Sequence, residues 1–165
     1  MAQLEFKGET VQSSGDIAVI MEQQGIPYER WGTRATPGAT DEDILTAYQP
    51  DIDKLKTERG YVTTDLVVLN KSTPNLENIC KKFVDEHHHV EDEVRFVVEG
   101  EGVFEIFGKD AEPLKFKAEA GDLIVIPAER RHLFYLTETK AIRCIRLFKT
   151  TEGWDAIYDK SALTT

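Results

Sequence analysis

The sequence has few cysteines, few basic residues and no long apolar run. Two cysteines in a chain of 165 residues cannot form a disulfide framework, so both thiols are expected to stay reduced and buried. No apolar run approaches the roughly 18 residues that a membrane-spanning helix needs. The first residues, MAQLEFKGET, lack the basic and apolar regions of a signal peptide. These absences predict a cytoplasmic protein with no membrane partner.

Acidic residues outnumber basic ones, with 30 Asp and Glu against 20 Lys and Arg, which gives a net charge of −10. A surface that follows phosphates needs the opposite sign, so we expect no nucleic acid partner. Hydrophobic residues make up 41% of the chain, which is ordinary for a globular protein and excludes a disordered one. The length is close to the roughly 150 residues of one domain, so a single domain over residues 1–165 is expected.

Residues 1–82 carry mostly helical signals. The apolar run between Ser13 and Gly25 predicts a helix over residues 16–24, because serine caps helix N-termini and glycine ends helices. Thr40 and Asp43 resemble a capping box. The other elements expected here are helices over residues 44–48, 51–59 and 75–82 and one strand over residues 61–69. We interpret this part as a mixed helical extension with one strand that packs on the rest.

From residue 83 onward the pattern changes to short segments of strand-forming residues with turns at glycines. The expected strands cover residues 83–89, 94–99, 102–107, 114–117, 123–126, 132–137 and 141–148. Seven short strands at this spacing predict an antiparallel sandwich or barrel, with its core over about residues 83–158.

The segment EHHHVEDEVRF contains three of the four histidines of the chain. Alternate side chains of a strand share a face, so His87 and His89 should point together and His88 away. Glu93 and Arg95 share this parity if the chain stays extended. Two imidazoles and a carboxylate can hold a divalent metal, because imidazole suits iron, nickel, copper and zinc.

The remaining histidine, His132, begins a later expected strand and offers a ligand from a second segment. The alternative is a solvated, acidic, histidine-rich loop. The carboxylate at a fixed offset and the histidine on a second strand favour the metal site.

This pattern resembles the two motifs of the cupin superfamily. The first motif, H-x-H, three or four residues, E, six residues and G, matches His87, His89, Glu93 and Gly100. The second motif, G, five residues, P-x-G, two residues, H, three residues and N, matches Gly121, Pro127 and His132. Lys81, Glu129 and Leu136 stand where the motifs usually have Gly, Gly and Asn. The change at Glu129 bears on the turn before His132.

The residues around these motifs are similar to the acireductone dioxygenase family, in which E-H-x-H, E-D-E-[VI]-R-[FY] and G-x-G follow one another. Three later stretches agree with it: GDLIVIPAERRH, AIRCIRLF and EGW. The resemblance covers roughly residues 60–158. It implies a mainly β protein: a cupin-type antiparallel β-barrel, also called a double-stranded β-helix or jelly roll, with an N-terminal helical extension.

The resemblance also implies roles for individual residues. His87, His89, Glu93 and His132 would bind one Fe(II) or Ni(II) ion per chain. Arg95 would be catalytic by holding an oxygen of the substrate anion, and its alternative is a surface salt bridge with Glu93 or Glu105. The residues implied to line a slot for the methylthio tail, or to close it, are Phe83, Val97, Phe134 and Trp154. For these four, plain core packing is the alternative.

The activity implied is that of a methionine-salvage dioxygenase acting on a methylthio-acireductone. With Fe(II) the substrate would yield formate and the oxo acid precursor of methionine. With Ni(II) it would yield formate, carbon monoxide and methylthiopropanoate. The expected partners are the acireductone and dioxygen, and we expect a monomer. The alternatives are another single-domain cupin dioxygenase and a non-catalytic cupin that binds a metal or a small ligand.

Overall fold

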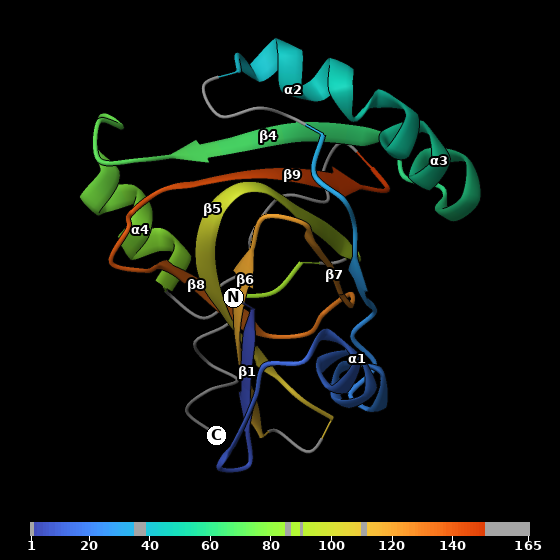
Figure 1. The fold of residues 1–165 in the computed structure, drawn as a ribbon, viewed down its shortest axis with the longest axis vertical. Coiled ribbons are helices and arrows are strands. Elements are labelled where there is room, and N and C mark those ends of the chain that lie inside the picture. Colours follow the sequence, from blue (N-terminus) through green and yellow to red (C-terminus); the bar gives the residue numbers. More distant parts are fainter. Residues whose placement is uncertain (1, 35–38, 85–86, 90, 110–111, 151–165) are drawn as a thin grey trace.

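The structure, a computed structural model, describes residues 2–34, 39–84, 87–89, 91–109 and 112–150. The predicted slot residue Trp154 lies outside these residues. Within these described ranges, nine strands form one curled antiparallel sheet, and helices lie outside it (Figure 1). The strands are β1 (Gln3–Phe6), β2 (Glu9–Val11), β3 (Tyr28–Arg30), β4 (Thr63–Leu69), β5 (Glu93–Phe107), β6 (Pro113–Glu119), β7 (Asp122–Ile126), β8 (His132–Leu136) and β9 (Ile142–Phe148). The predicted cupin-type barrel is confirmed.

Strand β5 is the element that joins the two halves of the curled sheet. Its first half pairs with β7 and β9, and its second half pairs with β6 and β8. The register with β9 shifts between Val97 and Glu99, and Gly100 has a φ of 81°. A Cβ at this glycine would collide with the Ala141 carbonyl, so only glycine fits the bend. The two strands predicted over residues 94–99 and 102–107 are therefore one bent strand, because Gly100 marks a bulge and not a turn.

Helices cover two sides of the sheet. They are α1 (Ser14–Gln23), α2 (Asp41–Ala47), α3 (Gln49–Arg59) and α4 (Leu76–Val84). In Figure 1, α2 and α3 lie along β4 and β9, whereas α1 lies at the other end of the molecule. The capping box is confirmed, because Thr40 Oγ1 accepts from Asp43 N and the Asp43 carboxylate accepts from Thr40 N.

Two apolar layers hold this arrangement together. The outer layer packs α2 and α3 on one face of β5, where Phe96 and Val98 meet Ile44 and Ile52. The inner layer fills the barrel and includes Val97 and Phe104. The first half of β5 is thus buried on both faces, which is why its sequence lacks the polar alternation of a half-exposed strand. The β5 side chains of the inner layer, such as Val97 and Phe104, therefore point into the barrel.

The N-terminal part contributes more to the sheet than the sequence predicted. Besides β4 it supplies β1, β2 and β3, whereas one strand was expected. Each of the three is only three or four residues long, and β3 consists of Tyr28, Glu29 and Arg30. Strands this short show no alternation of their own and form because they find pairing partners: β1 pairs with β6, β2 with β1, and β3 with β7. A local pattern could not predict them.

The strand predicted over residues 83–89 is wrong. Phe83 is the penultimate residue of α4, and among the described residues His87 forms an isolated bridge with His132 where a strand was expected. Leu76, Ile79 and Phe83 follow helical spacing and pack against the inner layer, so the helix extends through Phe83.

None of the helices in the described ranges is long and apolar enough to cross a membrane. Cys80 and Cys144 are both free thiols. Cys144 is buried as expected, whereas Cys80 is only partly buried, so the expectation that both thiols are buried is wrong for Cys80.

Candidate metal centre

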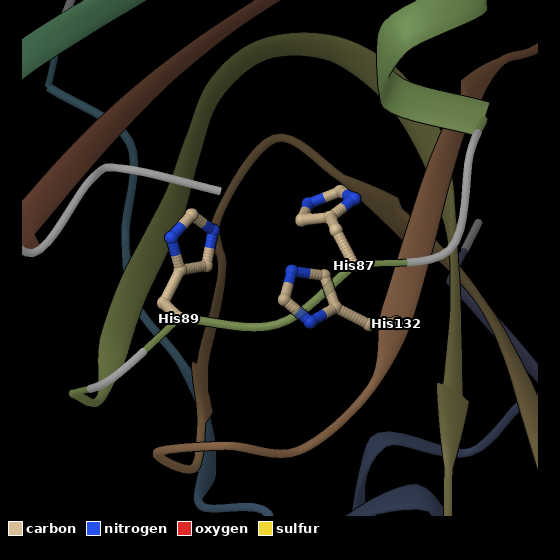
Figure 2. Close-up of side chains that lie close together, drawn as sticks. All are labelled: His87, His89 and His132. Carbon is tan, nitrogen blue, oxygen red and sulfur yellow. The ribbon is translucent and has the colours of Figure 1, made fainter. Parts of the chain in front are cut away.

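Three imidazoles meet inside the barrel (Figure 2). His87 and His89 come from the segment before β5, and His132 is the first residue of β8. Reciprocal backbone hydrogen bonds of 2.9 Å between His87 and His132 hold the two segments side by side. All three side chains are buried, and one ring nitrogen of each lies within 4.8 Å of the others. His88 is partly exposed, so the predicted alternation of this segment is confirmed.

Glu93 brings a carboxylate to the same place. It is the first residue of β5 and is fully buried. Its Oε2 lies 2.9 Å from His89 Nε2 and 3.6 Å from His132 Nε2. The four residues that the sequence singled out as ligands therefore lie together.

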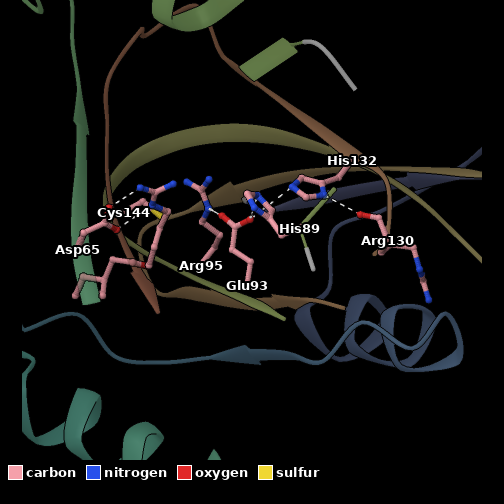
Figure 3. A network of polar contacts seen from close by, with 9 residues as sticks. Asp65, His89, Glu93, Arg95, Arg130, His132 and Cys144 are labelled. Carbon is pink, nitrogen blue, oxygen red and sulfur yellow. Dashed lines mark hydrogen bonds and ion pairs between the residues drawn. The ribbon is translucent and has the colours of Figure 1, made fainter. Parts of the chain in front are cut away.

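The tautomer of His132 follows from its second ring nitrogen. His132 Nδ1 lies 2.9 Å from the Arg130 carbonyl oxygen, which can only accept, so Nδ1 carries the hydrogen (Figure 3). His132 Nε2 is then a lone-pair atom, and it faces the equally buried Glu93 Oε2. Two buried acceptor atoms that face each other are costly unless a cation lies between them. The donor set therefore fits a divalent metal ion.

Arg95 forms a buried ion pair with Glu93. Arg95 Nε donates to Glu93 Oε1, and both side chains are buried. Burial alone would raise the pKa of Glu93, but the charge of Arg95 and the contacts with His132 and His89 together outweigh burial and hold that pKa well below its usual range. Burial would lower the pKa of the Arg95 guanidinium, but Glu93 and Cys144 together outweigh burial and raise that pKa above its ordinary value. The alternative for Arg95 was a surface salt bridge with Glu93 or Glu105. Glu93 is the partner, but the salt bridge is buried and does not lie on the surface.

The thiol of Cys144 lies beside the same guanidinium, and its Sγ donates to the Ile145 carbonyl oxygen at 3.7 Å. Burial raises the pKa of this thiol, so it stays protonated. The ring of Phe104 lies 5.8 Å from the Arg95 guanidinium carbon. Arg95 is thus enclosed by a carboxylate, a thiol and an aromatic ring.

The apolar residues predicted to line a slot belong to the inner layer or pack against it, and two of them are linked to Arg95 through the ring of Phe104. Phe134 packs on Phe104 with ring centroids 4.8 Å apart, and Phe83 packs edge-on to Phe134 at 5.8 Å. Val97 belongs to the same inner layer. Phe83 thus reaches its predicted neighbours from a helix and not from a strand.

The turn between β7 and β8 ties both histidine segments together. Glu129 N donates to the His89 carbonyl at 2.7 Å, and Arg130 N donates to the Pro127 carbonyl at 3.1 Å. Glu129 stands where the cupin motif has glycine and adopts a left-handed conformation with a φ of 62°. The turn is kept despite the substitution, at the cost of backbone strain.

Glu129→Gly is expected to raise the free energy of unfolding by about 0.5–1 kcal/mol. A left-handed conformation costs an L-residue about 1–2 kcal/mol, and glycine recovers it while losing about 0.5–1 kcal/mol of chain entropy. Lys140→Gly, at a φ of 48° in a turn after β8, is the matched control and should gain a similar amount. Urea unfolding of both variants measures this. A loss of stability confined to Glu129→Gly would show that the glutamate side chain itself stabilises the turn.

Sequence analysis missed the Arg130 carbonyl as a partner of His132. A backbone acceptor leaves no trace in residue identity, and the spacing of the second motif was the only signal of a turn at this place.

Comparison with known proteins agrees with this geometry. The family model described as ARD/ARD' family matches residues 6–156. The chain is 41% identical to an acireductone dioxygenase of Sulfurihydrogenibium sp. over 100% of this chain and 98% of the relative. It is 39% identical to that of Bacillus pumilus, with 93% of each chain covered. Among solved structures, the acireductone dioxygenase from Bacillus anthracis with cadmium ion in the active center has a TM-score of 0.89 and 36% identity, covering 96% of this chain and 98% of that one.

Proposed function

The chain belongs to the acireductone dioxygenase family and is a metal-dependent dioxygenase, and we propose that it cleaves a methylthio-acireductone with dioxygen in methionine salvage. The observation that carries the proposal is the pair of buried acceptor atoms, His132 Nε2 and Glu93 Oε2, inside the group of imidazoles. A site of this kind requires a cation, and its donor types are those of first-row metals that handle dioxygen.

The proposed ligands are His87, His89, Glu93 and His132, with one Fe(II) or Ni(II) ion per chain. Three neutral imidazoles and one carboxylate balance one of the two positive charges, so the site keeps an attraction for an anionic substrate. When bound, the metal supplies a Lewis acid and a template for the two oxygens of the enediolate. Support for this set comes from the burial of all four side chains.

Arg95 has two proposed tasks. Its Nε donates to Glu93 Oε1 and so fixes the carboxylate, with Oε2 turned toward His89 and His132. A guanidinium carries five N–H donors, so others remain for an oxygen of the substrate anion. The positive charge of the guanidinium would stabilise the enediolate in a buried site from which water is largely excluded. We therefore propose Arg95 as both the orienting partner of Glu93 and a substrate contact.

Phe83, Val97 and Phe134 are proposed to surround the methylthio tail. They adjoin Arg95 through Phe104, so a substrate with its anionic end at the guanidinium would extend its tail toward the aromatic rings. Thioethers pack well against aromatic rings. Trp154 keeps its proposed place at the mouth as a prediction.

The test of the metal and products is to reload metal-free protein anaerobically with Fe(II) or with Ni(II) and then supply acireductone and dioxygen. We expect formate from both samples and carbon monoxide from the Ni(II) sample alone, because the resemblance to the acireductone dioxygenase family implies that the products depend on the bound metal. Headspace gas analysis and formate quantification measure this. The same products from both samples would contradict the proposed dependence on the metal.

A cytoplasmic location and a monomeric state belong to the proposal as well. The free thiols of Cys80 and Cys144 support the reducing compartment. Size-exclusion chromatography with light scattering tests the monomer.

A further inference from the structure

We propose that Arg130 is a positioning residue of the metal centre, whose side chain fixes the turn that sets the tautomer and orientation of His132. The inference rests on the metal site proposed above and assigns to it a residue that touches neither metal nor substrate.

The guanidinium of Arg130 joins segments that are far apart in the sequence. Arg130 Nη1 donates to the Gln24 carbonyl at 2.9 Å and to the Phe107 carbonyl at 3.3 Å. Gln24 is the C-terminal cap of α1, and Phe107 is the last residue of β5. The carbonyl end of a helix carries partial negative charge, which favours a cation there. The turn between β7 and β8 is thereby fastened to a helix and to the central strand.

The backbone of this turn is held at several points as well. Arg130 N donates to the Pro127 carbonyl at 3.1 Å, and the Arg131 carbonyl accepts from Phe107 N at 3.1 Å. Phe107 therefore makes two hydrogen bonds to the turn. Its N–H donates to the Arg131 carbonyl, and its carbonyl accepts from the Arg130 side chain. The peptide that lies between these points carries the Arg130 carbonyl. Its direction is set by both sets of contacts together.

That carbonyl is the acceptor for His132 Nδ1 at 2.9 Å (Figure 3). The two neutral tautomers of imidazole are otherwise close in energy, and only one of them leaves Nε2 free to bind a metal. Partners of this kind typically change metal affinity about 10–100-fold when they are removed. An alanine at position 130 keeps the backbone carbonyl but removes the side-chain contacts, which are one of the two sets of contacts that fix the direction of this carbonyl. We therefore expect a loss of metal affinity at the lower end of this range, about tenfold.

Lys109 provides a matched control at the same end of α1. Its Cε lies 3.2 Å from the place where a Cβ on Gly25 would stand. Its side chain makes no hydrogen bond or ion pair to residues 127–131 within the ranges that the structure describes. Lys109→Ala therefore removes a cation beside the helix end without touching the turn.

The experiment measures the affinity of Arg130→Ala, Arg130→Lys and Lys109→Ala for Ni(II) by competition with a chelator. We expect Arg130→Ala to bind Ni(II) about tenfold more weakly than the parent. Arg130→Lys should lie between, because one ammonium group cannot span both carbonyls in the fixed geometry of a guanidinium. Lys109→Ala should match the parent. Nitrogen NMR of the histidine rings in the metal-free proteins is the second readout, and His132 should lose its single Nδ1-protonated form in Arg130→Ala.

Unchanged Ni(II) affinity in Arg130→Ala, with His132 still protonated at Nδ1, would overturn the inference. If Arg130→Ala does not fold, Arg130→Lys decides on the same two readouts. An equal loss of affinity in Lys109→Ala would also overturn it, since helix-end charge would then be the cause. A parent protein that binds no Ni(II) would instead contradict the proposed function, so the two failures are distinguishable.

Discussion

Replacing His132 by alanine is expected to remove the bound metal and to lower oxygen uptake more than about 100-fold. Residues one step away from a metal already change affinity about 10–100-fold, and His132 is proposed to touch the ion itself. The substitution also leaves Glu93 Oε2 without the facing ring nitrogen at 3.6 Å. Metal content after dialysis and oxygen uptake with acireductone measure the two losses together.

His88→Ala is the control for this experiment. His88 lies between two proposed ligands, but its side chain is partly exposed and has the opposite parity. It should keep full metal content and activity. If His132→Ala kept its metal and its activity, the ligand assignment would be wrong. If His88→Ala lost its metal as well, the loss would reflect disturbance of the segment and not removal of a ligand.

The second large effect concerns the buried pair of Glu93 and Arg95. Arg95→Met is expected to lower the free energy of unfolding of the metal-free protein by about 3–5 kcal/mol, because a buried carboxylate loses its cation. Glu93→Gln should cost a similar amount by leaving the guanidinium without its carboxylate partner. Both side chains are buried, so solvent screens little of this energy. Urea unfolding of the metal-free variants measures it.

The double variant Arg95→Met with Glu93→Gln separates stability from catalysis. It contains neither buried charge, so we expect it to regain most of the stability that each single variant loses. It should nevertheless remain inactive, because it lacks both the carboxylate ligand and the guanidinium. A double variant no more stable than the single ones would contradict the energetic role of the pair. Substantial activity in it would remove both residues from the reaction.

The grouping of the four proposed ligands was predictable because they come from one short segment and one spaced histidine. Two-residue alternation places His87 and His89 on one side whether the segment is a long strand or a single bridge. The prediction that His87 and His89 point to the same side therefore did not depend on the wrongly predicted strand over residues 83–89. The chain between them and Glu93 did not need to be a regular strand, since the start of β5 fixes the direction of Glu93.

Other features depended on contacts that no local pattern contains. Gly100 was interpreted as a turn because a bulge and a turn favour the same residue. Strands β1 and β3 exist through pairing with β6 and β7, which are distant in sequence. The carbonyl of Arg130 became a partner of His132 only through the folded turn. Residue types and spacing were enough to propose the ligands, whereas the groups that support the proposed ligands are backbone groups and long-range contacts.

Oxygen uptake by metal-free protein, reloaded anaerobically with Fe(II) and given freshly generated methylthio-acireductone, tests the central claim most directly. The comparison is with the same protein without metal and with substrate alone. We predict rapid uptake with release of formate in the reloaded sample only. No uptake above the substrate-only rate, in a sample shown to contain bound Fe(II), would contradict the claim that these four side chains form the centre of an acireductone dioxygenase.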